Sequence, residues 1–248
     1  MTKAQVVVRE LRQIGEFADV FRLFDEIWHP APANPPVTVE LMRVFSHTGG
    51  YVAGAYEGGR LVGASVGILA KDNTLHSHVT GAAPGRGVGH ALKTHQRAWC
   101  AERGIDRITW TFDPLVRRNA HFNLAKLGAR AIEYVEGFYG AMADAINEGD
   151  ESDRLVVEWL VKEQDAPAVP YEGVVALEEE DRLPVRGQVK GPVALVGTPA
   201  DIEALRHEDP SAAMAWRLAM REVLGGLMAD GGRVADFTKN GEYVVLIG

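Results

Sequence analysis

The sequence predicts a mixed α/β fold. Strand-like and helix-like apolar patterns alternate over residues 6–161 in the order β-α-α-β-β-β-α-β-α-β-β, which is typical of one sheet domain. A glycine-rich turn, residues 85–90, follows one of the strands and directly opens a helix. A proline-containing stretch at residues 164–170 reads as a linker. We therefore expect one domain over residues 1–163 and a small C-terminal α+β subdomain over residues 164–248.

The N-terminal elements follow from β-branched residues and helical spacing. Residues 6–10 form a short β-branched run, which predicts a first strand. Apolar residues then recur at helical spacing over residues 14–28, and several prolines break the chain before residue 37. Thr38 is a suitable N-cap for a second helix that runs toward His47.

The middle of the domain alternates between strands and helices. Gly58-Gly59 separates two apolar runs and predicts a hairpin, and residues 75–81 form the next strand. In the helix expected over residues 89–103, Leu92 and Trp99 lie seven residues apart on one face. The remaining elements are a strand at 107–112, a helix at 116–127, and strands at 129–135 and 155–161.

The C-terminal subdomain has one well-marked helix. Asp209 can cap it, Pro210 suits its first position, and Trp216 lies on its apolar face. Strands are expected at residues 193–196, 234–237 and 243–247, and the acidic run 178–181 is interpreted as a solvated turn. Core packing is the simpler interpretation of Trp216, although a buried position in a homodimer interface is an alternative.

Composition limits the classes of function. The net charge of −8 argues against a generally basic nucleic-acid-binding protein. The single cysteine, Cys100, excludes an intrachain disulfide and is interpreted as a buried apolar residue. We find no secretory signal and no apolar stretch approaching the roughly 20 residues that span a bilayer. The expected location is the cytoplasm, without a membrane partner.

The glycine-rich turn predicts a phosphate-binding site. Backbone N–H groups at the start of a helix lie at the positive end of its dipole and bind phosphate oxygens. Glycines at 85, 87 and 89 let the backbone approach an anion closely. The sequence contains neither the Gly-Lys-Ser/Thr end of a P-loop nor the Gly-x-Gly-x-x-Gly of a dinucleotide site. The alternative is a tight turn that only joins two elements.

A family resemblance covers roughly residues 5–162. The order of the elements, the helix start at residues 86–92, Arg-Gly-Val-Gly-His-Ala-Leu, and the segment 119–128 resemble the GNAT acyltransferase superfamily. More narrowly, residues 110–115, with 118–121 and Leu124, are similar to the characteristic stretch of an uncharacterised group in which a GNAT domain carries a C-terminal extension. The resemblance implies a mostly antiparallel, splayed sheet flanked by helices. It also implies acetyl-CoA as the co-substrate and a small-molecule amine as the acceptor.

The resemblance also implies which residues hold acetyl-CoA. Backbone groups of one strand would pair with the pantetheine arm, the N–H groups of the turn would bind the pyrophosphate, and Arg86 could add a charged contact. A residue at the start of a later helix could contact the ligand or cap that helix. The full set is Val79, Thr80, Gly81, Arg86, Gly87, Val88, Gly89, His90 and Asn119.

The sequence departs from the family pattern at two places. Pro84 occupies the position where the family has Gln or Arg, and the loop from Pro84 to Gly87 is about three residues short. Many family members have a tyrosine that acts as general acid toward the CoA thiolate, and Leu124 stands at that position here.

Three other residues are candidates for proton transfer: His78 on the fourth strand, Asp113 after the fifth, and Tyr139 after the sixth. For each there is a structural alternative: a packed strand histidine, a cap of the following turn, and a loop tyrosine that covers apolar surface. His76 and His78 could share one sheet face, but no third metal ligand is evident, so we expect no metal.

Two functions are consistent with these observations. The first is an acyl-CoA-dependent N-acyltransferase that acts on a small or amino-acid-like amine, and the start of the helix after the turn favours it. The second is a non-catalytic binding or regulatory protein with weakened CoA binding, which the short turn and Leu124 favour.

Overall fold

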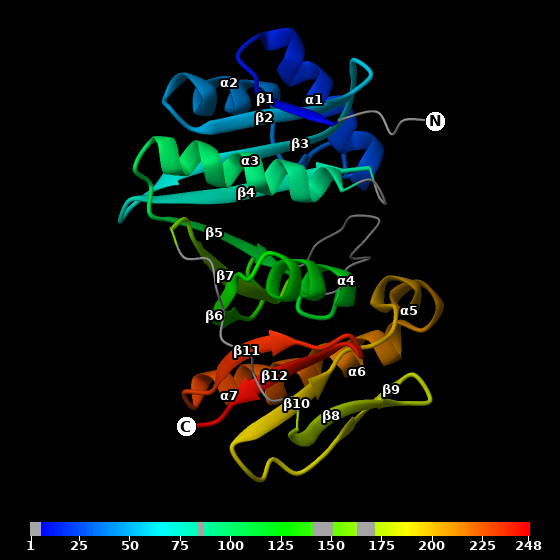
Figure 1. Ribbon diagram of the computed structural model, residues 1–248. Coiled ribbons are helices and arrows are strands. Elements are labelled where there is room, and N and C mark those ends of the chain that lie inside the picture. Colours follow the sequence, from blue (N-terminus) through cyan, green and yellow to red (C-terminus); the bar gives the residue numbers. More distant parts are fainter. Residues whose placement is uncertain (1–5, 84–86, 141–150, 163–171) are drawn as a thin grey trace. The chain divides into compact units, whose positions relative to one another are not determined.

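The computed structural model describes residues 6–83, 87–140, 151–162 and 172–248 of the chain (Figure 1). The eleven predicted elements appear in the expected order, and the single helix expected at residues 116–127 consists of a short α-helix followed by a π-helical turn. In the structure these elements are β1 (Val7–Glu10), α1 (Ile14–Trp28), α2 (Val39–His47), β2 (Tyr51–Glu57), β3 (Arg60–Ala70), β4 (Thr74–Ala82), α3 (Val88–Glu102), β5 (Arg107–Phe112), α4 (Arg117–Ala120), the π-helical turn η1 (His121–Lys126), β6 (Arg130–Val135) and β7 (Arg154–Leu160).

These strands form one seven-stranded sheet with the order β1-β2-β3-β4-β5-β7-β6. The pairs β1–β2, β2–β3, β3–β4 and β6–β7 are antiparallel, whereas β4 and β5 run parallel. The parallel pairing joins Thr74–His76 to Arg107–Thr109. The expected mixed α/β fold with a mostly antiparallel sheet and flanking helices is therefore confirmed.

The chain divides into two compact units. Unit 1 contains Met1–Trp110 and Leu160–Glu163, and unit 2 contains Thr111–Trp159 and Gln164–Gly248. The division crosses both β5 and β7, whereas the sequence suggested a single boundary after residue 163. The second half of the sheet thus belongs to the same compact unit as the C-terminal segment.

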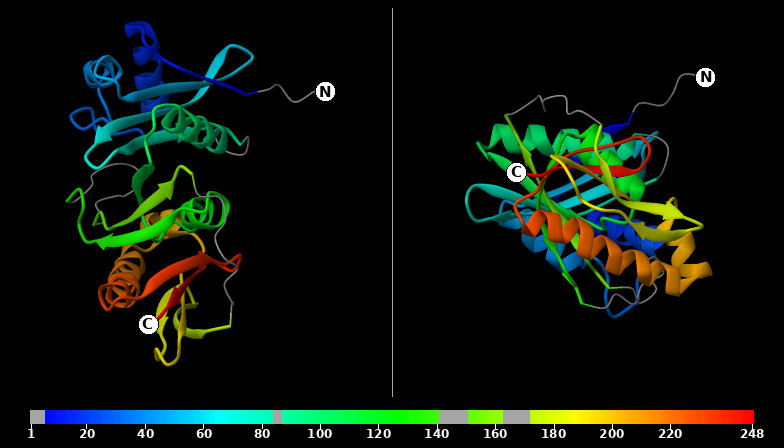
Figure 2. Two further views of the ribbon diagram at one scale, coloured as in Figure 1. Left: turned by 60° about the vertical axis from the view of Figure 1, so that its left-hand side comes forward. Right: turned by 90° about the horizontal axis from the view of Figure 1, so that it is seen from below.

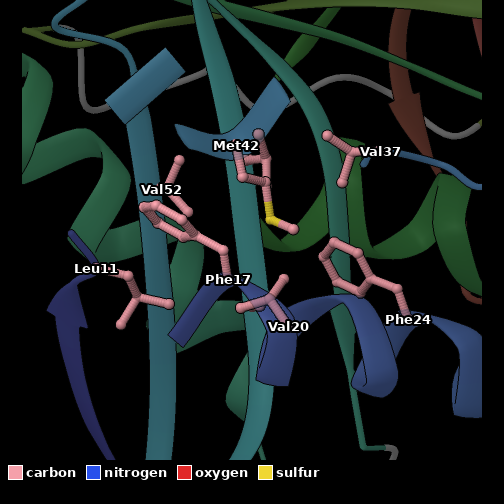
Figure 3. Close-up of a cluster of buried hydrophobic side chains, with 9 residues drawn as sticks. Leu11, Phe17, Val20, Phe24, Val37, Met42 and Val52 are labelled. Atoms are coloured by element: carbon pink, nitrogen blue, oxygen red, sulfur yellow. The ribbon is translucent and has the colours of Figure 1, made fainter. Parts of the chain in front are cut away.

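In unit 1, helices cover both faces of the sheet. Gly63 and Ala64 are neighbours on β3 and therefore face opposite ways. A side chain at Gly63 would meet Val88 and Leu92 of α3, while Ala64 is buried in a cluster with residues of α1 and α2. Figure 3 shows this second cluster, in which α1 contributes three of the labelled side chains. Its labelled members are Leu11, Phe17, Val20, Phe24, Val37, Met42 and Val52.

Local signals position these elements as expected. The Thr38 hydroxyl accepts a hydrogen bond from the Leu41 N–H and caps α2. At the β2–β3 hairpin, Gly58 and Gly59 both have positive φ angles, 57° and 83°, which glycine adopts without strain. Cys100 is fully buried, and burial raises the pKa of its thiol to about 12. Its interpretation as apolar filler is confirmed.

Unit 2 adds a second sheet with the order β11-β12-β10-β8-β9. Figure 2 shows the β8–β9 hairpin and the long helical run that accompanies this sheet. The elements are β8 (Val174–Glu180), β9 (Leu183–Arg186), β10 (Val193–Gly197), α5 (Ile202–Glu208), α6 (Pro210–Met220), the π-helical η2 (Arg221–Gly225), α7 (Gly226–Ala229), β11 (Arg233–Phe237) and β12 (Glu242–Leu246).

The sequence predicted β10, α6 and the last two strands of this unit, but not β8, β9 and α5. Asp209 caps α6, and Pro210 occupies its first turn, as predicted. The acidic run at 178–181 is not a turn throughout, because its first three residues end β8. The reversal to β9 falls at Asp181 and Arg182, whose φ angles are 49° and 69°. The charges are tolerated because their side chains are exposed.

Trp216 is completely buried within unit 2, and its indole N–H donates to the carbonyl of Arg182 at 2.9 Å. Core packing accounts for this side chain, and the homodimer stays a prediction. The expected linker at 164–170 lies outside the described residues. In the described part of the chain, no helix has the length and apolarity that crossing a membrane requires.

Candidate functional site

The start of α3 has a glycine in a left-handed backbone conformation. Gly87 is the N-cap residue, with φ 72° and ψ 9°, and a side chain there would meet nothing within 4 Å. Val88 is buried against the sheet, whereas Gly89 is half-buried and His90 is exposed. The first N–H groups of a helix have no partner within the helix. Pro84, Gly85 and Arg86 lie outside the described residues.

The other long helices are capped by side chains. Glu16 accepts from the Gln13 N–H at the start of α1, Thr38 caps α2, and Asp209 caps α6. The N-cap of α3, Gly87, has no side chain that could do this. The N-terminal groups of this helix therefore suit an external acceptor such as a phosphate.

The expected pantetheine strand, residues 79–81, leads toward this helix. Along one edge, Val79, Thr80 and Gly81 pair with β3. On the other side, the pairing of β4 with β5 ends at His76. Gly81 packs closely on α1, because a side chain there would come within 2.6 Å of the Trp28 ring. Among the described residues, this edge of residues 79–81 does not pair with β5, so its backbone groups can bind the amides of an extended ligand, as in strand addition.

A β-bulge interrupts β4 just before this segment. Val79 is opposite Val66 and Ser77 is opposite Gly67, so His78 is the extra residue. Its ring Nε2 lies 2.9 Å from the carbonyl oxygen of Pro36. Bulges redirect side chains and end regular pairing, and they occur often beside active sites.

His76 is directed elsewhere than His78. Its ring Nδ1 lies 3.2 Å from the hydroxyl of Thr109 on β5. Burial, with smaller effects of His78 and Lys93, lowers the pKa of His76. Within the described residues, no group of three or more His, Cys, Asp or Glu side chains is arranged to hold a metal ion.

Sequence reasoning missed a buried lysine beneath β4. Lys93, on the inner face of α3, is 4% exposed. Its Nζ donates to the Ser77 hydroxyl at 2.9 Å and to the Gln96 amide oxygen at 3.4 Å, and lies 3.7 Å from the ring centroid of Trp110. Polar residues on a predicted helix normally indicate its solvated face, so the helical spacing alone gave no signal for this site.

Burial controls the ionisation of Lys93. Removal from water disfavours the ammonium form and lowers the pKa of Lys93 to about 7. Gln96 is held in turn, because its amide nitrogen donates to the Ser65 hydroxyl at 3.3 Å, and Ser65 lies 2.8 Å from the Thr80 hydroxyl. A continuous polar network therefore runs from Lys93 to the expected pantetheine strand.

Two of the candidates for proton transfer lie in unit 2. Tyr139 is exposed, and its hydroxyl lies 3.4 Å from that of Thr111 at the end of β5. Its backbone N–H donates to the hydroxyl of Ser152 at 2.8 Å, and the guanidinium of Arg154 lies 5.3 Å from its ring centroid. The Tyr139 hydroxyl is thus accessible and placed by local contacts.

Asp113 is buried in an ionic cluster. Arg217 donates to both carboxylate oxygens, at 3.0 and 2.8 Å, and Arg206 donates to one of them at 2.5 Å. Burial alone would raise the pKa of Asp113, but Arg217 and then Arg206 outweigh it and hold that pKa well below its usual range. Asp113 also accepts from the Leu115 N–H at 2.9 Å, so the predicted turn cap is confirmed.

Asn119 and Leu124, the last two positions singled out in the sequence, lie in the helical segment formed by α4 and η1. Asn119 is half-buried in α4, and its backbone N–H donates to the Val116 carbonyl at 2.9 Å. Leu124 is 7% exposed and lies in η1. A leucine has no proton to donate, so a general acid must come from another residue if this chain is an enzyme.

Comparison with known proteins places this fold. No family model matches the sequence, and no curated protein sequence matches it either. Among solved structures, the chain is similar to the ribosomal-protein-S18-alanine N-acetyltransferase of Escherichia coli, with TM-score 0.52 and 11% identity over 66% of this chain and 99% of that one. A probable acetyltransferase from Staphylococcus epidermidis gives TM-score 0.53 and 13% identity, over 63% and 99%.

A third similar structure is a Salmonella typhimurium protein described as an acetyltransferase and solved with its cofactor acetyl-CoA. It gives TM-score 0.51 and 13% identity, over 66% of this chain and 99% of that one. These structures are covered almost completely, whereas about a third of this chain extends beyond the match. Together with the seven-stranded sheet and the order of its elements, this likeness shows that the chain contains a domain of the GNAT acetyltransferase fold.

Proposed function

We propose that this protein is an acyl-CoA-dependent N-acyltransferase that uses acetyl-CoA and a small or amino-acid-like amine. The observation that carries the proposal is the start of α3, where Gly87 caps the helix with a left-handed backbone and open space above it. Next to it, residues 79–81 have an edge that does not pair with β5. Phosphate at the helix start and amides along the strand edge are the two interactions that an acyl-CoA needs.

In the proposed reaction, the amine attacks the thioester carbonyl and the CoA sulfur leaves. The residues at 87–90 hold the pyrophosphate through backbone N–H groups, and Val79, Thr80 and Gly81 hold the pantetheine arm. Arg86 and Asn119 remain proposed ligand contacts. Of the three candidates for proton transfer, His78 lies at the bulge of β4, Tyr139 presents an accessible hydroxyl, and Asp113 is enclosed by arginines.

Calorimetric titration with acetyl-CoA tests the binding site. We expect binding by the wild-type protein and a loss of at least tenfold in affinity for Gly87→Ala, because the new methyl group occupies space next to the N–H groups and strains a backbone with φ 72°. Gly104→Ala is the matched control. Gly104 ends the same helix with φ 67° and equally open surroundings, so the variant shares the strain but not the site.

The two variants separate binding from folding. Both should lose about 1 kcal/mol of unfolding free energy, the usual cost of replacing a glycine with positive φ. If acetyl-CoA fails to bind the wild-type protein at millimolar concentration, or if both variants bind equally well, the proposed site is wrong.

A second measurement tests the accessible tyrosine. Release of CoA from acetyl-CoA is followed across a panel of small amines and amino acids, and Tyr139→Phe is expected to lower turnover at least about tenfold with little change in acetyl-CoA affinity. Phe138→Leu, at the exposed neighbouring aromatic position, is the control for altered loop packing. Equal turnover by Tyr139→Phe and wild type would remove Tyr139 from the mechanism.

The non-catalytic alternative rests on Leu124, which occupies the family's general-acid position with an apolar side chain. It predicts weakened acetyl-CoA binding and no CoA release for any amine in the panel. The same two measurements therefore distinguish an enzyme from a binding or regulatory protein.

A further inference from the structure

Lys93 lies at the point where β4 and β5 stop pairing. The last paired residues are His76 on β4 and Thr109 on β5. The next residue of each strand, Ser77 and Trp110, is a partner of the Lys93 amine, at 2.9 Å from the hydroxyl and 3.7 Å from the ring centroid. The amine thus bridges both strands, directly beyond the end of their ladder.

All three protons of the ammonium form have an acceptor at this position. They are the Ser77 hydroxyl, the Gln96 amide oxygen and the face of the Trp110 ring. Each of these partners is neutral. The site therefore accommodates the ammonium but supplies no full negative charge, so that this buried amine can also exist without its extra proton.

The titratable groups that face Lys93 do not change this description. From β4, His76 has a pKa that burial, His78 and Lys93 lower, and from α3, Cys100 has a pKa that burial raises to about 12. Both are therefore neutral near pH 7. From β3, Ser65 acts on Lys93 only indirectly, through its hydrogen bond with Gln96. From β5, the Trp110 ring contacts the amine directly. None of these three side chains carries a charge.

The direction of a bound acyl-CoA follows from the proposed function. With pyrophosphate at the start of α3 and pantetheine along residues 79–81, the ligand runs from the carboxyl end of β4 toward its middle. Its sulfur end then reaches the bulge at His78 and the residue before it, Ser77. The hydroxyl of Ser77 is the group to which Lys93 donates.

We propose that Lys93, through the hydroxyl of Ser77, supplies the proton that the CoA sulfur takes up when the acyl group leaves. Ser77 is the catalytic residue, since its hydroxyl would touch the sulfur, and Lys93 is the positioning residue that returns a proton to it. The inference rests on the proposed function. It supplies the general acid that Leu124 cannot provide.

The proton and electron balance is complete. The amine nitrogen forms a bond to the acyl carbon, the carbon–sulfur bond breaks, and the sulfur keeps the electron pair. The Ser77 hydroxyl gives its proton to the sulfur and takes one from the Lys93 ammonium, which becomes a neutral amine. The proton lost by the acceptor nitrogen passes to solvent, and Lys93 regains one from solvent. An ammonium with a pKa of about 7 is a stronger acid than an ordinary thiol, so the transfer is downhill.

The first test asks whether Lys93 senses the sulfur. NMR of the full chain with isotope-labelled lysine follows the titration of Lys93, assigned with Lys93→Met, alone, with CoA, and with desulfo-CoA, which lacks the thiol. We expect the midpoint with CoA to differ by about half a pH unit from the midpoint with desulfo-CoA, because only the thiol can contact the Ser77 hydroxyl to which Lys93 donates. Ser77→Ala should abolish this difference, because it removes the hydroxyl that links Lys93 to the sulfur.

The second test is the pH profile of turnover with an amine that the panel identifies. Wild-type turnover should fall as pH rises through about 7, whereas Lys93→Met should be slower by roughly 10²-fold and lack this limb. Lys93→Arg keeps the charge but cannot release a proton near neutrality, so it should not restore the rate. The matched control is Lys71→Met, at an exposed lysine of the β3–β4 turn, with wild-type turnover expected.

The outcomes distinguish this inference from the function on which it rests. If neither CoA nor desulfo-CoA binds, the proposed function itself has failed. If both ligands bind but shift Lys93 equally, or if Lys93→Arg turns over at the wild-type rate, Lys93 has no role in proton supply and the inference is overturned.

Discussion

Asp113→Ala is expected to lower the free energy of unfolding of unit 2 by about 3–5 kcal/mol, because it leaves two buried arginines without their carboxylate. Arg206 and Arg217 are 3% and 0% exposed, so water cannot replace the lost charge. Urea unfolding followed by circular dichroism measures the change. Asp113→Asn keeps the shape and the Leu115 contact and should cost less, which isolates the charge.

The exposed ion pair Arg118–Glu203 provides the control. It is bidentate, with one Nη2–Oε1 distance of 2.6 Å, but the Arg118 side chain is mostly exposed. Glu203→Ala should therefore cost no more than about 1 kcal/mol. An Asp113→Ala effect as small as that of Glu203→Ala would contradict the assignment of Asp113 to a buried stabilising cluster.

The pH dependence of Asp113 has a definite sign. Its pKa in the folded protein lies below the unfolded value, so its stabilisation is fully present above about pH 4 and is lost as the pH falls through the acid range. Wild-type unit 2 should lose stability on acidification more steeply than Asp113→Ala does.

Lys93→Met is expected to stabilise unit 1 at neutral pH by about 2–4 kcal/mol. The unfolded chain holds the lysine proton up to about pH 10, whereas the folded protein releases it near pH 7. Protonation thus favours the unfolded state between these two values. Methionine has a similar length and needs no proton, so it removes this cost, although the Ser77 and Gln96 hydrogen bonds are lost with it.

The measurement is denaturant unfolding at several pH values. Between about pH 7 and 10 the wild-type protein should become more stable as the pH rises, because the unfolded state binds more protons there. Lys93→Met should lack this part of the slope, whereas the exposed control Lys71→Met should keep it. Parallel slopes for wild type and Lys93→Met would mean that Lys93 keeps an ordinary affinity for its proton.

The parts of the fold that the sequence predicted are those with local signals. The Thr38 and Asp209 caps, the Gly58-Gly59 hairpin and the glycine start of α3 each depend on residues within a few positions. The likeness to GNAT structures agrees with the order of elements that these signals produced.

The features that the sequence did not predict depend on distant partners. Lys93 and Gln96 are buried because Ser77 and Ser65, on two strands, satisfy their polar atoms. Nothing near Lys93 in the sequence indicates those partners.

The same holds for Asp113, whose turn cap was predictable from Pro114. Its main partner, Arg217, is 104 residues away in the sequence. The ionic cluster was therefore not predictable from the sequence. The role of Tyr139 in proton transfer remains a prediction.

The division of the chain into units that cross β5 and β7 has a consequence for biosynthesis. Nearly all of unit 1 has left the ribosome once Trp110 emerges, so this half can collect its contacts early. The carboxylate of Asp113 must wait for Arg206 and Arg217, which are synthesised 93 and 104 residues later. Contacts between residues that are far apart in sequence form slowly. The segment from Thr111 onward therefore stays unfolded longer during synthesis, and we expect chaperones to bind it at that stage.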